Sequence, residues 1–163
     1  MSVPESFCAI CADRGRTCCR DTAVFITHGD VRRIARVAGG GDPFYEYRAA
    51  GEEAAAPEIF DDVLWRRVLG SDGRRRILLH RQGGDCVFLT QTGCRLSEMT
   101  RPLLCRLYPF GYDETAIKGA HAHLCPRPEA DNPALLLALL GMNRGRAETW
   151  RAMLYREVDE EFS

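Results

Sequence analysis

Eight cysteines are the side chains in this sequence best suited to chemistry, because a thiolate can bind a metal, form a disulfide or react with oxidants. They fall into two sets: Cys8, Cys11, Cys18 and Cys19 near the N-terminus, and Cys86, Cys94, Cys105 and Cys125 further along the chain. Two residues separate Cys8 from Cys11, a spacing that lets both sulfurs bend towards one ion. We therefore predict that all eight cysteines are metal ligands, for zinc or for an iron–sulfur cluster.

The adjacent pair Cys18 and Cys19 complicates the count of sites. In extended backbone their side chains point to opposite faces, so the pair either serves two neighbouring metals or supplies one ligand and one spare thiol. Eight thiolates can fill two four-coordinate sites, or hold one cluster with thiols left over. In both cases we expect the two sets to meet in one region, at the end of a small hairpin.

The redox setting decides between metal and disulfides. The first eight residues lack a charged region followed by an apolar one, so they do not resemble a secretory signal. The longest apolar run, Pro133 to Gly141, is far too short to cross a bilayer. We therefore expect a cytoplasmic, reducing location, where clustered cysteines indicate metal or redox chemistry. The formal net charge of -1 over 163 residues points neither to nucleic acid nor to a membrane as partner.

Histidines and charged residues near the cysteines have a functional and a structural interpretation. His121, His123 and Cys125 would share one face of a strand, but two surface histidines beside one ligand cysteine are favoured over a ligand trio. Arg101 could balance the charge of a metal site or an anionic substrate, or could satisfy backbone carbonyls. Asp85 is expected to shape the turn at 83–85 rather than to support Cys86.

Arginine accounts for nearly all the positive charge of the chain. Six arginines close to cysteines could offset the negative charge of a thiolate site: Arg14, Arg16, Arg20, Arg95, Arg106 and Arg127. The run Arg74-Arg75-Arg76 could contact nucleic acid, but it has no aromatic platform beside it and is expected to be solvated.

Local patterns predict the elements that must position the cysteines. The β-branched run 22–27 predicts a strand, and Thr27 with Asp30 predicts a capping box at the start of a helix that ends at the glycines 39–41. Its apolar stripe is Val31, Ile34, Ala35 and Ala38. Asp42-Pro43 is typical of a further helix start. Ile77 and Leu79 indicate a strand, and residues 86–96 a hairpin with a cysteine at each shoulder.

The remaining patterns are mainly helical. Ser97 could cap a short helix broken early by Pro102, and Pro109 would end any helix after it. Residues 49–57 suggest a linker, 58–69 a helix and 71–73 a turn. Pro133 would open a buried helix through Leu135 to Leu140, ended by Gly141. A longer amphipathic helix follows, with an inner face of Ala147, Trp150, Leu154, Val158 and Phe162. We predict a single small α+β domain over residues 1–163, with a motif region at 7–126 and a helical part at 131–162.

Taken together, the motif region resembles the CxxCxxCC cysteine-cluster family, the YkgJ-like zinc- or iron-chelating domains. The resemblance rests on Cys8-x2-Cys11, Cys18-Cys19, the run 85–89, Gly93-Cys94, the block from Arg101-Pro102 through Cys105-Arg106 to Pro109-Phe110, and Cys125. This chain departs from the family pattern in having six residues between Cys11 and Cys18 where the name implies two. The resemblance implies metal binding in a mostly bacterial, cytoplasmic setting.

Three kinds of function are compatible with these residues. The first is a binding module with a metal site that is structural or handles metal. The second is an enzyme, because the resemblance also includes flagellin lysine N-methylases, although no glycine-rich loop for a methyl donor is visible. The third is a redox sensor in which Cys18 and Cys19 oxidise and release metal.

Overall fold

A computed structural model describes residues 7–13, 17–20, 22–49, 68, 74–120, 125 and 128–163. Short helices alternate with three antiparallel strand pairs, β1–β2, β3–β4 and β5–β6, so the fold is α+β as predicted. Along the chain the elements are α1 (Phe7–Asp13), α2 (His28–Ala38), β1 (Tyr45–Ala49), β2 (Arg74–Leu78), β3 (Leu89–Thr90), β4 (Gly93–Cys94), α4 (Leu103–Leu107), β5 (Phe110–Tyr112), β6 (Ile117–Ala120), the 3₁₀ turn η2 (Pro128–Asp131), α5 (Pro133–Leu139) and α6 (Arg144–Phe162).

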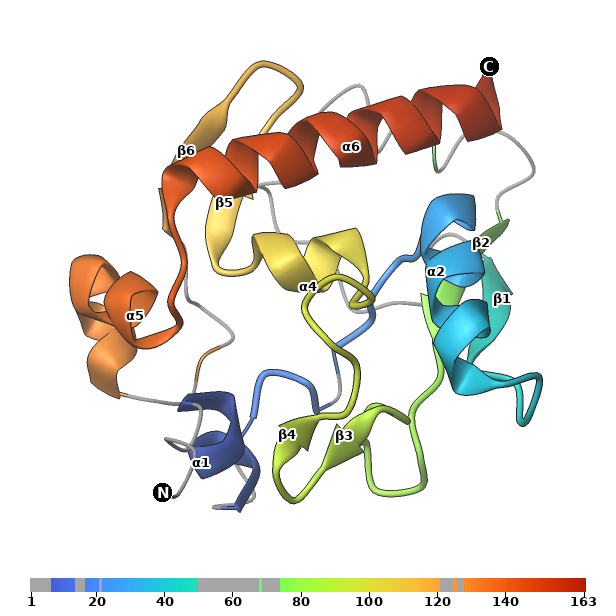
Figure 1. Cartoon of the computed structure of the whole chain (residues 1–163), viewed down its shortest axis with the longest axis horizontal. Helices are drawn as coiled ribbons and strands as arrows, with labels where there is room; N and C mark the ends of the chain where they lie inside the picture. The colour runs from blue at the N-terminus through green and yellow to red at the C-terminus, as the bar shows by residue number, and fades with distance from the viewer. Residues whose placement is uncertain are drawn as a thin grey trace.

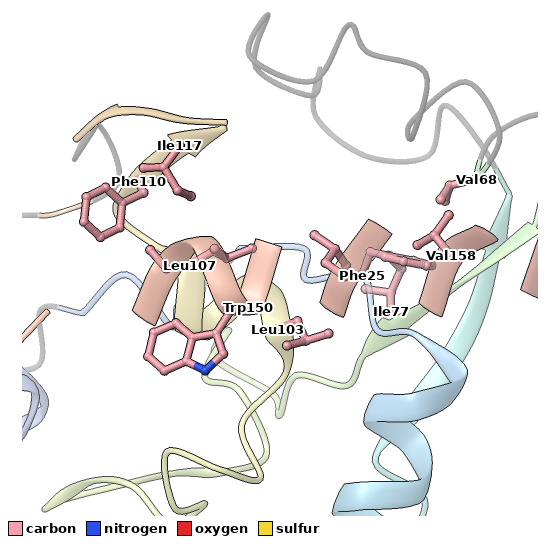
Figure 2. Packing of buried hydrophobic residues seen from close by; sticks show 11 residues of the cluster. Phe25, Val68, Ile77, Leu103, Leu107, Phe110, Ile117, Trp150 and Val158 are labelled. Carbon is pink, nitrogen blue, oxygen red and sulfur yellow. The ribbon is translucent and has the colours of Figure 1, made fainter. Parts of the chain in front are cut away.

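Helix α6 is the longest described element and runs along one side of the molecule (Figure 1). Helix α4, strand β6 and helix α2 pack against it, while α1 and the β3–β4 hairpin lie on the far side of α4 (Figure 1). The predicted inner face is confirmed: Ala147, Trp150, Leu154 and Val158 are buried, and Phe162 is partly buried against the same core. Figure 2 shows Trp150 and Val158 among the side chains of this core.

Helix α2 begins and ends where the sequence predicts. The Thr27 hydroxyl accepts a hydrogen bond from the Asp30 N–H, and the Asp30 carboxylate accepts one from the Thr27 N–H, which completes the capping box. Gly39, at φ 70°, closes the helix in the left-handed conformation that glycine adopts at low cost. Ile34 is fully buried, whereas Ala35, predicted on the same stripe, is exposed.

A second core cluster ties α2 to the hairpin. Its buried members are Ile26, Ile34, Leu78, Phe88 and Leu96. Phe88 precedes β3 and Leu96 follows β4, so both ends of the hairpin are anchored by buried side chains. Burying an apolar side chain of this size stabilises a fold by about 1.5–3 kcal/mol, which fixes the cysteines that flank these residues.

Two predictions for the N-terminal half are wrong in detail. Asp42-Pro43 does not start a helix: the aromatic residues Phe44, Tyr45 and Tyr47 favour extended backbone, and β1 pairs with β2 from Tyr45↔Leu78 to Ala49↔Arg74. The run 22–27 forms a single bridge, Phe25↔Ile77, rather than a full strand, although Leu78 N–H still donates to the Val24 carbonyl.

Three further predictions need correction. Pro102 does not break a helix, because α4 begins directly after it and residues 97–100 form a turn. Helix α5 is not a buried helix: Leu136 is buried, but Leu135 and Leu139 are 45% and 43% exposed. Arg75 and Arg76 are buried in β2 rather than solvated, and Arg76 forms an ion pair with Glu161 of α6.

The predicted linker at 49–57 lies outside the described residues apart from Ala49, which belongs to β1. The turn at 71–73 also lies outside them, as does the helix at 58–69 except for Val68, which is helical and buried in the main core. Among the described segments, we find no helix with both the length and the apolar character needed to cross a membrane.

Candidate metal centre

Two chain segments pair through their backbones and bring Cys19 and Cys86 together. Arg20 and Asp85 form an antiparallel bridge, and their side chains form an ion pair with 2.8 Å between Arg20 Nε and Asp85 Oδ1. One step along, the Cys86 N–H donates to the Cys19 carbonyl at 3.1 Å. Two cysteines separated by 66 intervening residues are therefore neighbours through backbone pairing. Asp85 ends its predicted turn, and its carboxylate pairs with Arg20 rather than with Cys86.

The β3–β4 hairpin carries the third cysteine. The Leu89 N–H donates to the Cys86 carbonyl at 2.9 Å, and Leu89 then pairs with Cys94 across the hairpin. Gly93 sits at φ 100°, a conformation that L side chains rarely adopt, which accounts for a glycine directly before Cys94. The prediction of a cysteine at each shoulder of a hairpin is confirmed in outline, with Cys86 three residues before β3 and Cys94 within β4.

The fourth cysteine, Cys105, lies in helix α4, which is only five residues long and relies on other segments for its position. The Leu103 N–H at the start of α4 donates to the buried Asp30 carboxylate at 3.1 Å. Arg106 is buried and donates to the carbonyls of Arg101 at 2.8 Å and Met99 at 2.5 Å. Arg106 therefore satisfies backbone carbonyls in the loop before α4.

The pKa shifts of these thiols show that they lie within electrostatic reach of one another. Burial raises the pKa of the Cys105 thiol well above its usual value, and negative charge on Cys19, Cys86 and Cys94 raises it further. Burial likewise raises the pKa of Cys86 to about 11, with the Phe88 N–H opposing the shift and Cys19 and Cys94 adding to it. Cys86, Cys94 and Cys105 therefore lie near one another rather than scattered over the surface.

Cys19 has the opposite shift. A hydrogen bond from the Cys18 thiol is the largest cause that lowers the pKa of Cys19 to about 6; burial opposes the shift, and Thr17 and Arg101 support it. The adjacent pair thus acts unequally, because Cys18 supports the thiolate of Cys19. Cys19 therefore ionises readily, whereas burial and nearby negative charge raise the pKa of Cys86, Cys94 and Cys105.

Arg101 places a positive charge close to two of these thiols, Cys94 and Cys19. Its guanidinium hydrogen-bonds the Cys94 thiol and its charge also favours the Cys19 thiolate. Its Nε donates to the Leu96 carbonyl at 3.1 Å. The backbone role expected of Arg101 is therefore confirmed, and the same guanidinium also carries its positive charge next to sulfur. Of the other arginines near cysteines, Arg95 stacks over the Phe88 ring at 5.2 Å.

The structure says less about the positions of the other predicted ligands. Helix α1 packs beside β4 and carries the buried Cys11, so the first cysteine set approaches the hairpin that bears Cys94 (Figure 1). The backbone of Cys8 belongs to α1, and Cys125 is partly buried. His121 and His123 lie outside the described residues. No disulfide joins any of the cysteines whose side chains are described.

The donor chemistry fits zinc or iron, which bind thiolate sulfur. A bound cation would offset the burial and the mutual repulsion that raise the pKa of Cys86, Cys94 and Cys105. In the described ranges, no three side chains of Cys, His, Asp or Glu stand in an arrangement ready to hold an ion. The sulfurs of Cys19, Cys86, Cys94 and Cys105 are thus gathered but not closed to ligand distance. We call these four side chains the thiol cluster.

Fold and site together define a small α+β protein that collects cysteines from separate segments. Residues 8–126 match the family model CxxCxxCC, described as "Putative zinc- or iron-chelating domain". The match covers well over half of the chain, so the protein belongs to this family. Comparisons with curated proteins and with solved structures each found no match. The resemblance inferred from the cysteine spacing is confirmed, and metal chelation is supported as the property of the family.

Proposed function

We propose that this protein chelates zinc or iron through a thiolate centre whose nucleus is the thiol cluster. The observation that carries the proposal is the convergence of cysteines from three separate parts of the sequence. Backbone pairing joins Cys86 to Cys19 and, through Leu89, to Cys94. Cys105 lies close enough for the charges of these thiols to raise its pKa. Unbonded thiols buried together are unfavourable once ionised, and a metal cation converts that repulsion into attraction.

The first cysteine set completes the proposed centre. Cys11 approaches through the packing of α1 on β4, and Cys18 supports Cys19 by a hydrogen bond. Cys8 and Cys125 remain proposed ligands on the strength of the sequence. Zinc bound here would cross-link the segments, whereas an iron–sulfur cluster would add redox chemistry. Because ligation needs reduced thiols, the proposal includes a reducing, cytoplasmic setting.

Nothing in the described residues or in the comparisons favours a lysine methylase or a redox sensor over simple chelation. The proposed function is therefore metal binding, with the bound metal left to experiment. Anaerobic purification followed by metal analysis and an absorption spectrum distinguishes the two forms. A coloured protein with iron and acid-labile sulfide identifies a cluster, and a colourless protein with stoichiometric zinc identifies a zinc site. Freshly purified protein that holds neither metal would contradict the proposal.

A further inference from the structure

His80 lies directly opposite Cys86 in an antiparallel bridge. Two backbone hydrogen bonds flank the pair: Arg81 N–H to the Asp85 carbonyl at 2.7 Å, and Val87 N–H to the Leu79 carbonyl at 3.0 Å. This pattern makes His80 and Cys86 a non-hydrogen-bonded pair, the kind in which opposed side chains come closest. Their Cβ atoms are expected to be about 4.5–5.5 Å apart on one face.

Cys19 extends the same row. Because Arg20 pairs with Asp85, the next position along brings Cys19 opposite Cys86, where the Cys86 N–H donates to the Cys19 carbonyl. Paired residues of neighbouring antiparallel segments share a face, and successive residues alternate between faces. His80, Cys86 and Cys19 therefore form one cross-strand row, while the Arg20–Asp85 ion pair occupies the opposite face.

The imidazole of His80 has an unsatisfied hydrogen-bonding atom in this position. Its Nε2 atom is buried and has no hydrogen-bond partner among the described residues. Leaving such a nitrogen buried and unsatisfied is unfavourable, so buried polar atoms of this kind normally have a partner. Imidazole nitrogen is a common ligand of both zinc and iron.

We propose that His80 Nε2 is a nitrogen ligand of the metal centre, beside Cys86. This inference rests on the proposed function and adds a donor that the cysteine pattern does not contain. A neutral imidazole in place of one thiolate lowers the negative charge of the site by one unit. The centre then holds mixed nitrogen and sulfur ligands, and not every cysteine of the chain is needed for one ion.

X-ray absorption fine structure on the anaerobically purified protein, with the metal it retains, tests this inference. For zinc we expect sulfur scatterers at about 2.3 Å and an imidazole nitrogen at about 2.0–2.1 Å in the wild type. His80→Ala should lose the imidazole contribution and bind Zn²⁺ at least about tenfold more weakly in chelator competition. His80→Gln, closer in size and still polar, gives the same test if the alanine variant does not fold. The matched control is His28→Ala, since His28 is exposed at the start of α2.

The outcomes separate this inference from the proposed function. Loss of the nitrogen signal in the His80 variants and its retention in His28→Ala support His80 as a ligand. A wild-type spectrum with sulfur alone, or a nitrogen signal that survives in both His80 variants, overturns the role of His80 and leaves chelation intact. A wild-type protein without zinc or iron contradicts the proposed function, and the inference fails with it.

Discussion

At the scale of single residues, charged side chains connect the thiol cluster with the rest of the molecule. They are Arg101, which lies beside the sulfurs, and Asp30 and Glu157. Arg101 faces the Cys94 and Cys19 sulfurs, and the Asp30 carboxylate holds the first N–H of α4. Arg33 donates to both Asp30 and Glu157, and the Thr27 hydroxyl donates to Glu157. The helix that carries Cys105 is therefore supported by a buried network of charges rather than by its own length.

We expect Arg101→Ala to weaken metal binding by roughly tenfold, because it removes the cation and the hydrogen bond that face Cys94 and Cys19. Competition with a chromophoric chelator under anaerobic conditions measures the change. Arg36→Ala is the control, since Arg36 is exposed in the last turn of α2. Equal affinity in the two variants would show that Arg101 acts on the backbone alone.

Glu157 predicts a pH dependence of stability. Burial raises its pKa, but hydrogen bonds from Arg33 and Thr27 outweigh burial and lower it below the usual 4.5. A carboxyl with a lowered pKa in the folded state stabilises the fold above pH 4.5, and this contribution is lost as the pH falls through the folded value. Burial raises the pKa of Asp30 despite its bonds to Arg33, which gives a dependence of opposite sign.

Comparing wild type with Glu157→Gln isolates the contribution of Glu157 from that of Asp30. At pH 7 the variant should lose about 2 kcal/mol in free energy of unfolding, measured by urea denaturation. The difference should shrink at pH 3. Glu160→Gln, an exposed change of the same kind on the same helix, should have little effect at either pH. A difference that does not change with pH would contradict the assigned role of Glu157.

At the scale of elements, close packing of α2 on α6 aligns the charged network. Gly29 is buried in the first turn of α2, and a Cβ at that position would collide with the Glu157 carboxylate. The glycine is therefore required by the neighbouring helix rather than by its own backbone, since alanine would otherwise favour the helix.

Gly29→Ala should destabilise the protein by about 1–3 kcal/mol through overpacking against Glu157. Gly145→Ala is the matched control on α6, because its Cβ would meet the Asn143 side chain at an ordinary 3.5 Å. Helix propensity predicts that this control is neutral or slightly stabilising. Thermal unfolding of both variants decides the matter, and equal midpoints would argue against a close Gly29–Glu157 contact.

At the scale of the whole molecule, local sequence signals predicted which helices and hairpins form. They did not predict which of these elements contact one another. The capping box of α2, the inner face of α6 and the hairpin beside Cys94 all follow from periodicity or turn chemistry. The contact of Asp30 with the start of α4, 73 residues away, left no local trace, because a capping residue has the same signature whether or not it also binds a distant N–H.

In the candidate site, too, the sequence predicted the residues but not the contacts between them. Cysteine spacing indicated metal and the family, yet the neighbours of each thiol depend on long-range pairing such as that of Cys19 with Cys86. His80 gave no signal because its partner lies across a bridge rather than at a motif spacing. Burial of Arg75 and Arg76 was also not predictable from a charge run, since Arg76 pairs with Glu161, which is distant in sequence.

The central claim is that the thiol cluster is the nucleus of one metal centre. Its most direct test is the metal content per chain of anaerobically purified wild type and of the single variants Cys86→Ser, Cys94→Ser and Cys105→Ser. Thr92→Ser, an exposed change at the tip of the same hairpin, is the control. We predict stoichiometric zinc or iron in wild type and control, and loss of most of it in each cysteine variant. Full metal content in all three cysteine variants, or none in the wild type, would contradict the claim.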